Sequence, residues 1–144
     1  MKIAIVDDEI IWRERVRDEI LRYDKEKENE IDFFPSGEAY LVCEKCYDIT
    51  FVDIEMPGLD GFETITRTKE KDANGIYIIL TTHTEMSRKG YTVSAFRYID
   101  KHHMEEVKEA LDSAKIILGR NKKIEVNVIG DGVRKIALKN IIYV

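Results

Sequence analysis

Apolar and polar residues follow two patterns along this chain, short apolar runs and longer stretches with helical spacing. The short runs predict five strands, at about residues 3–6, 31–34, 49–53, 76–80 and 96–99. The stretches between and after them predict five helices, at about residues 10–24, 38–46, 62–71, 86–93 and 104–118. Strands that alternate with helices predict an α/β fold, in which a parallel sheet is covered by helices on both faces.

The pattern changes after Gly119, which we expect to end the last helix. A polar linker, a strand with period-two alternation, a GDG turn and a returning strand follow at 120–123, 124–128, 130–132 and 133–138. A β-hairpin of this size is only marginally stable by itself. The sequence therefore predicts one domain over 1–119, and over 120–144 a linker with the opening of a second, truncated domain.

Composition excludes several classes of protein. The chain has 144 residues, of which 44% are hydrophobic and 35% charged, as expected of a globular domain. A net charge of −5 argues against electrostatic binding of nucleic acid by this chain. No apolar run approaches the roughly 20 residues that cross a bilayer, and the N-terminus has no signal-peptide pattern. We therefore expect a cytoplasmic protein without membrane contact.

The two cysteines, Cys43 and Cys46, have the C-x-x-C spacing of zinc and redox sites. A zinc site would need a second pair of ligands, and the histidines are His83, His102 and His103. A thioredoxin-like pair should begin a helix after a strand, whereas this pair closes a predicted helix before a strand. We expect the two cysteines to be structural.

Acidic, hydroxyl and basic residues stand where the predicted strands end. Strand by strand, they are Asp7 with Asp8, Asp53, Thr81 with Thr82, and Lys101. In an open parallel sheet these ends meet at one edge, where ligands bind. Residues 7–9 are consecutive acids, the last being Glu9, and they repel one another unless a cation lies among them.

An oxygen-rich site of this kind suits Mg²⁺, which binds one or two carboxylates and keeps positions for water or phosphate. The ammonium of Lys101 would add positive charge, so that the ion and the lysine could hold a phosphoryl group together. A carboxylate oxygen of Asp53 could attack phosphorus, and the Thr81 hydroxyl could bond to the new group. An Asp-Asp pair alone is more often a solvated turn, so this interpretation depends on the whole set of strand ends.

Four segments of the chain resemble the receiver domain of bacterial two-component response regulators. They are "VDDE" at 6–9, "FVDIEMPGLDG" at 51–61, "ILTT" at 79–82 and "YIDK" at 98–101. The resemblance spans about residues 1–119 and implies a flavodoxin-like, doubly wound sheet of five parallel strands in the order 2-1-3-4-5. It also implies phosphoryl transfer from a sensor histidine kinase. We expect no enzyme activity beyond self-phosphotransfer and self-dephosphorylation.

By this resemblance the phosphoacceptor is Asp53. The implied Mg²⁺ ligands, with Asp8 binding directly, are Asp7, Asp8, Asp53 and the backbone carbonyl of Glu55. The residues implied to contact the phosphoryl group or to switch with it are Thr81, Lys101 and Tyr98. Secondary candidates are Thr82 and Glu9.

One position departs from the family. Receivers usually have a proline after the lysine, with a cis bond that aims the amine, and here His102 follows Lys101. A cis bond before a residue other than proline costs roughly 2.5–4 kcal/mol. A trans bond with a displaced lysine is therefore the alternative to the family arrangement.

The tail, 124–144, resembles the first strands of LytTR-type DNA-binding domains of bacterial transcription regulators. This resemblance implies a transcription-regulating output, with a homodimer forming on activation. It also implies that the full-length protein, rather than this chain alone, binds DNA.

Two other functions stay open. One is a protein-interaction or dimerisation module with a receiver fold that works without phosphorylation. The other is a Mg²⁺-dependent phosphatase, which generally needs an acid/base residue two positions beyond its aspartate and a cap over the pocket. Glu55 has that spacing from Asp53, but the sequence has no cap insertion.

Overall fold

The computed structural model describes residues 1–24, 29–72, 74–82 and 95–130, with side chains as far as Gly119. Within these residues, five strands form one parallel sheet in the order β2-β1-β3-β4-β5. They are β1 (Lys2–Val6), β2 (Glu30–Phe34), β3 (Ile49–Asp53), β4 (Ile76–Thr81) and β5 (Arg97–Asp100). The predicted parallel sheet and its strand order are therefore confirmed.

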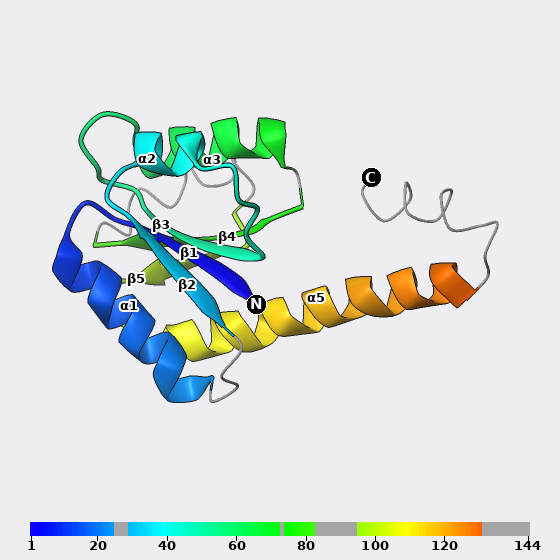
Figure 1. Cartoon of the computed structure of the whole chain (residues 1–144). Helices are drawn as coiled ribbons and strands as arrows, with labels where there is room; N and C mark the ends of the chain where they lie inside the picture. The colour runs from blue at the N-terminus through cyan, green and yellow to red at the C-terminus, as the bar shows by residue number, and fades with distance from the viewer. Residues whose placement is uncertain (25–28, 73, 83–94, 131–144) are drawn as a thin grey trace.

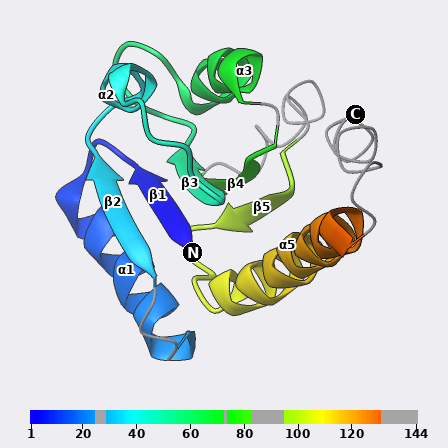
Figure 2. The same ribbon diagram turned by 45° about the vertical axis from the view of Figure 1, so that its right-hand side comes forward.

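Helices cover both faces of this sheet (Figure 1). α1 (Ile10–Tyr23) and α5 (Glu106–Gly130) lie against one face, and α2 (Gly37–Val42) and α3 (Gly61–Lys71) lie against the other. Figure 2, turned by 45°, shows the same layers with the sheet between them. The helix predicted at 86–93 and His83 lie outside the described residues.

The strands send alternate side chains to the two faces, as the pleat of a β-sheet requires. Ile3 and Ile5 of β1 belong to the core that the sheet forms with α1 and α5. Ala4 and Val6 belong to the core on the other side, with residues of α2 and α3. Because both faces are covered, the central strands are apolar almost throughout. The short apolar runs in the sequence have this origin.

α2 ends at Val42 instead of at Cys46, so the predicted end of this helix is wrong. The chain leaves the helix early and places Tyr47 beneath it. The Tyr47 ring lies 5.8 Å from the Phe34 ring, and its hydroxyl donates a hydrogen bond of 2.6 Å to Asp32 on β2. Burial of an aromatic ring with a bonded hydroxyl outweighs the small gain in free energy from continuing the helix through residues 43–46.

α5 continues through Gly119 to Gly130, so the predicted helix end at Gly119 and the predicted strand at 124–128 are wrong. A glycine inside a helix costs only about 1 kcal/mol relative to alanine, and extending an existing helix adds one hydrogen bond per residue. Ile124 and Val128 are four positions apart, so the alternating pattern also fits a helix. The remainder of the predicted hairpin, 131–144, lies outside the described residues.

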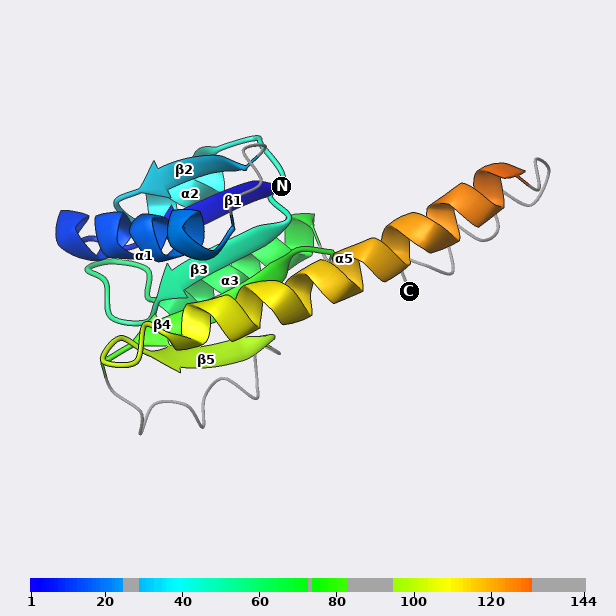
Figure 3. The ribbon, with the colours of Figure 1, turned by 90° about the horizontal axis from the view of Figure 1, so that it is seen from below.

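Figure 3 shows that α5 extends well past the edge of the sheet. Despite its 25 residues, neither α5 nor any other helix in the described part of the chain is long and apolar enough to cross a membrane.

Candidate functional site

The strand register brings the predicted site residues to one edge of the sheet. Val6 lies opposite Val52, and Asp53 lies opposite Leu80, so the ends of β1, β3 and β4 are level. Thr81 lies opposite Asp100 at the end of β5. The residues after these pairs therefore lie at the same edge of the sheet, where the loops begin, as predicted for parallel strands.

Three acids meet at this edge. Each of Asp7, Asp8 and Asp53 offers a carboxylate oxygen, and these oxygens lie within 4.8 Å of one another. Asp7 and Asp53 are buried, at 1% and 6% exposure, whereas Asp8 is exposed. Glu9 does not belong to this group; its backbone N–H instead donates to Asp7 at 2.9 Å. Two buried oxygen donors with a third open to water form a set that fits Mg²⁺, which keeps part of its hydration shell.

The ammonium of Lys101 lies among the acids. Its Nζ is 2.7 Å from Oδ2 of Asp7 and 3.4 Å from Oδ2 of Asp53, and its side chain is 4% exposed. Three carboxylates against one ammonium leave uncompensated negative charge in a largely buried place. The arrangement is therefore suited to a further, divalent cation.

The pKa of Asp53 reflects its burial first and the excess of negative charge around it second. Burial, and next the charge of Asp7, raise the pKa of Asp53 to about 7, although the Lys101 ammonium and the backbone amide of Glu55 act in the opposite direction. A carboxyl with such a pKa lacks sufficient positive charge nearby. Any cation bound between the acids would favour its ionised form.

The loop from β3 to α3 is held close to Asp53. The backbone N–H of Gly61 donates to the carbonyl of Ile54 at 2.9 Å, which closes the loop that carries Glu55. A Cβ at Gly61 would collide with the carbonyl oxygen of Asp53, so only glycine permits this approach. Asp60 caps α3 by accepting from the N–H of Glu63 at 2.8 Å, as its position in the sequence suggests.

The structure distinguishes the two threonines after β4. Thr81 is buried, whereas Thr82 is exposed. The carbonyl of Thr81 accepts a hydrogen bond from the backbone N–H of Lys101 at 2.8 Å, so these two residues are joined through the main chain. Thr81 is therefore the threonine whose position is tied to the acid cluster.

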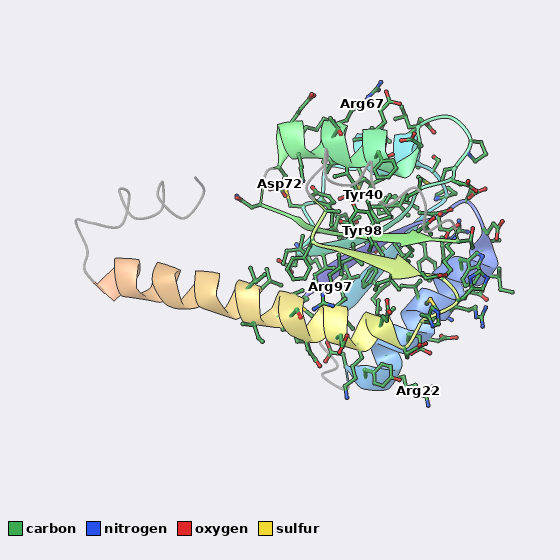
Figure 4. All side chains as sticks on the ribbon, turned by 180° about the vertical axis from the view of Figure 1, so that it is seen from behind. Arg22, Tyr40, Arg67, Asp72, Arg97 and Tyr98 are labelled. Carbon is green, nitrogen blue, oxygen red and sulfur yellow. The ribbon has the colours of Figure 1, made fainter. Side chains whose placement is uncertain are left out.

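Tyr98 is half-buried and packs with the core on the α2 and α3 side of the sheet. Figure 4 shows Tyr98 and its neighbour Arg97 on opposite sides of β5. Tyr98 pairs with Ile79 of β4, two residues before Thr81, and residues two apart share a face. Tyr98 and Thr81 thus lie on the same face of neighbouring strands.

His102 does not displace the lysine. No peptide bond in the described residues is cis, so the Lys101–His102 bond is trans, and Lys101 nevertheless reaches Asp7 and Asp53. The exposed His102 ring and its backbone N–H both contact Oδ1 of Asp100 at 2.9 Å. The trans bond of the alternative is thus confirmed, whereas Lys101 still contacts both acids of the site.

Sequence reasoning missed one residue beside the lysine. The ring of Trp12, on α1, lies 4.8 Å from the Lys101 ammonium. The available signal was its position on the first turn after the acids, because a helix that begins there must cover the site. Cys43 and Cys46, in contrast, lie after α2 with free thiols, and the described metal-binding group contains neither.

Comparison with known proteins shows the family to which this chain belongs. A family model for the response regulator receiver domain matches residues 3–112. The positive alginate biosynthesis regulatory protein of Pseudomonas aeruginosa is 34% identical over 116 residues, 79% of this chain and 47% of that protein. The sensory transduction protein LytT of Oceanobacillus iheyensis is 28% identical over 143 residues, 89% of this chain and 57% of that protein. The chain thus spans about half the length of these two relatives.

A solved structure with the same fold is the response regulator TrrA of Thermotoga maritima in complex with Mg²⁺-BeF. It matches with a TM-score of 0.68 and 30% identity, over 78% of this chain and 97% of that one. The fold, a flavodoxin-like receiver fold, is thus shared over nearly the whole of that protein.

Proposed function

Because this chain belongs to the response regulator receiver domain family, we propose that Asp53 accepts a phosphoryl group from a phosphohistidine of a sensor histidine kinase. The observation that carries the proposal is the position of the Asp53 carboxylate. It lies in a group of three acids and 3.4 Å from the Lys101 ammonium, at the edge of the sheet where the parallel strands end. The reaction depends on Mg²⁺.

In the transfer, a carboxylate oxygen of Asp53 bonds to phosphorus while the P–N bond of the donor breaks. The electron pair of that bond stays on the imidazole nitrogen, which is then protonated from water. Asp53 must be ionised to attack, and Lys101 favours this form and lies where it can approach the oxygens of the phosphoryl group. Later attack of water on phosphorus releases phosphate and restores the carboxylate.

The residues suited to hold Mg²⁺ are Asp7, Asp8, Asp53 and the backbone carbonyl of Glu55. When bound, the ion supplies the positive charge that neutralises the phosphoryl oxygens and the three carboxylates. Asp7 is already oriented for this task, because Oδ1 accepts from the N–H of Glu9 at 2.9 Å and Oδ2 accepts from Lys101 at 2.7 Å.

We further propose that the phosphoryl group switches the face formed by β4, β5 and α5. Its charge of about −1.5 to −2 attracts the Thr81 hydroxyl and the Lys101 ammonium. The main-chain bond between these residues carries the shift to β5, where Tyr98 responds. Such a change selects one of two arrangements that the protein already samples.

The output belongs to the longer protein of which this chain would form the receiver. Relatives with about twice its length carry regulatory names, such as the positive alginate biosynthesis regulatory protein. We propose transcription regulation through a DNA-binding domain, with a homodimer forming on activation. Residues 120–130 continue α5, and the assignment of 120–144 to a linker and the start of a LytTR-type domain otherwise stays a prediction. We expect no turnover of an external small substrate.

Mass spectrometry of the intact chain tests the proposal. After treatment with acetyl phosphate and Mg²⁺ we expect the mass of one phosphoryl group, which is absent with EDTA and in Asp53→Asn. Asp112→Asn, on the exposed face of α5, is the matched control and should gain the same mass as the wild type. If the wild-type chain gains no mass, or Asp53→Asn gains it too, the proposal fails, and the first outcome favours the phosphorylation-independent module.

A further inference from the structure

Trp12 is placed against the site by the start of α1. This helix begins at Ile10, directly after the acids, and Arg13 on its first turn donates to the backbone carbonyl of Asp7 at 2.8 Å. That bond fixes the first turn of α1 relative to the end of β1. The half-buried ring of Trp12 therefore has a defined position beside Lys101.

The Lys101 ammonium has three N–H groups and is almost fully buried. Its Nζ lies 2.7 Å from Oδ2 of Asp7 and 3.4 Å from Oδ2 of Asp53. The Trp12 ring lies 4.8 Å away and presents a surface that attracts cations. A buried ammonium needs partners on every side, and here one of them is an aromatic ring instead of an acid or water.

The ring differs from the acids in one respect that matters for function. Asp7 and Asp53 are the same carboxylates that would hold a metal ion, so a bound ion competes with Lys101 for them. An uncharged ring does not bind Mg²⁺, which is a hard ion with oxygen ligands. Trp12 can therefore keep its contact with the ammonium while the acids exchange partners.

We propose that Trp12 is a positioning residue that holds the Lys101 ammonium beside Asp53 during phosphoryl uptake. The inference rests on the proposed function. The inference requires that the aromatic ring of Trp12, rather than the size of its side chain, keeps the Lys101 ammonium in place. Arg15 offers a matched comparison, because its guanidinium lies 5.0 Å from the same ring but its residue is exposed.

Three variants, Trp12→Leu, Trp12→Phe and Arg15→Met, separate these contributions. The first readout is the rate of phosphoryl uptake from acetyl phosphate with Mg²⁺. We expect Trp12→Leu to slow uptake about tenfold, because it removes a desolvated cation–π contact. Trp12→Phe, which keeps an aromatic face, should lose about threefold or less, and Arg15→Met should react like the wild type. Equal rates for the leucine and phenylalanine variants, or a wild-type rate for both, would overturn the inference.

The second readout needs neither Mg²⁺ nor a phosphodonor. Urea unfolding of the wild type, Trp12→Leu, Lys101→Met and the double variant gives a thermodynamic cycle. If Trp12 holds the ammonium, Trp12→Leu should change the unfolding equilibrium about tenfold more with Lys101 present than with methionine there. The same change in both backgrounds would mean that Trp12 only fills space, and the inference would be lost.

The two readouts also separate this inference from the proposed function. A wild-type chain that takes up no phosphoryl group refutes the proposed function, and the urea cycle then decides alone whether Trp12 holds Lys101. A wild-type chain that is phosphorylated normally, with no loss in Trp12→Leu, refutes only the role of Trp12.

Discussion

Replacing Asp53 with asparagine should stabilise the metal-free protein, although it removes the proposed phosphoacceptor. The reasons are the burial of the Asp53 carboxylate and the imbalance of charge at the strand ends, where Asp7, Asp8 and Asp53 share one ammonium. An amide has nearly the shape of a carboxylate and carries no charge. Asp53→Asn therefore removes both the cost of burying a charge and the repulsion from Asp7, and Lys101 keeps its 2.7 Å contact with Asp7.

The pKa of Asp53 sets the size of the effect. It is about 7 in the folded chain against an ordinary value of 3.8, and the ion pair with Lys101 is already included in this shift. At pH 8 the charged form therefore destabilises the folded state by about 4 kcal/mol at most. Because the folded-state pKa is raised, this destabilisation is complete above pH 7. It declines as the pH falls toward 3.8, and at pH 5 less than half of it remains.

Urea denaturation in EDTA at pH 8 and pH 5 measures this difference. We expect Asp53→Asn to be more stable than the wild type by up to about 4 kcal/mol at pH 8 and by clearly less at pH 5. Asp112→Asn should leave stability nearly unchanged at both values. Mg²⁺ should reverse the order at pH 8, since the ion stabilises the wild type more strongly. A variant that is no more stable than the wild type at pH 8, or a difference that does not depend on pH, would refute the reasoning.

Three further outcomes follow from single contacts. Tyr47→Phe removes the 2.6 Å bond that lowers the pKa of Asp32. It should cost about 1–2 kcal/mol at pH 7. The loss should shrink as the pH falls below the ordinary value of 3.8 and through the lowered pKa of Asp32, as measured by thermal unfolding across this range. Gly61→Ala should cost about 1–3 kcal/mol by collision with the end of β3, whereas Gly119→Ala meets nothing within 4 Å and should be neutral or slightly stabilising in a melting experiment. Mg²⁺ should change the fluorescence of Trp12, the only tryptophan, and an unchanged spectrum at saturating ion would contradict the metal site.

The sheet and its acid edge could be predicted because both depend on residues close in sequence. A strand that is covered on both faces must be apolar almost throughout, and the residue after it must face the edge of the sheet. Asp7 and Asp53 follow from this rule without knowledge of any contact between them. The pairing of β1 with β3 then brings the two carboxylates together.

Features that depend on competition between distant groups could not be predicted. The early end of α2 requires that Tyr47 reach Asp32, a contact that no local pattern contains. The strand pattern alone does not separate Thr81 from Thr82, because it does not show where β4 ends relative to β5, and only the family resemblance favoured Thr81. α5 passes Gly119 because a glycine is only a small penalty within a helix that is already formed.

The same imbalance that destabilises the site makes it responsive. The backbone of Asp53 is fixed by the pairing of β3 with β4, so repulsion among the acids cannot shift this backbone without breaking the sheet. Lys101 is less constrained, because it lies in a turn after β5 and its ammonium depends on partners that a metal ion or a phosphoryl group would alter. Its backbone bond to Thr81 means that a shift of the lysine also acts on the end of β4. We therefore expect that charge added to the acid cluster acts first on the ends of β4 and β5, through direct contacts and without a long pathway through the protein.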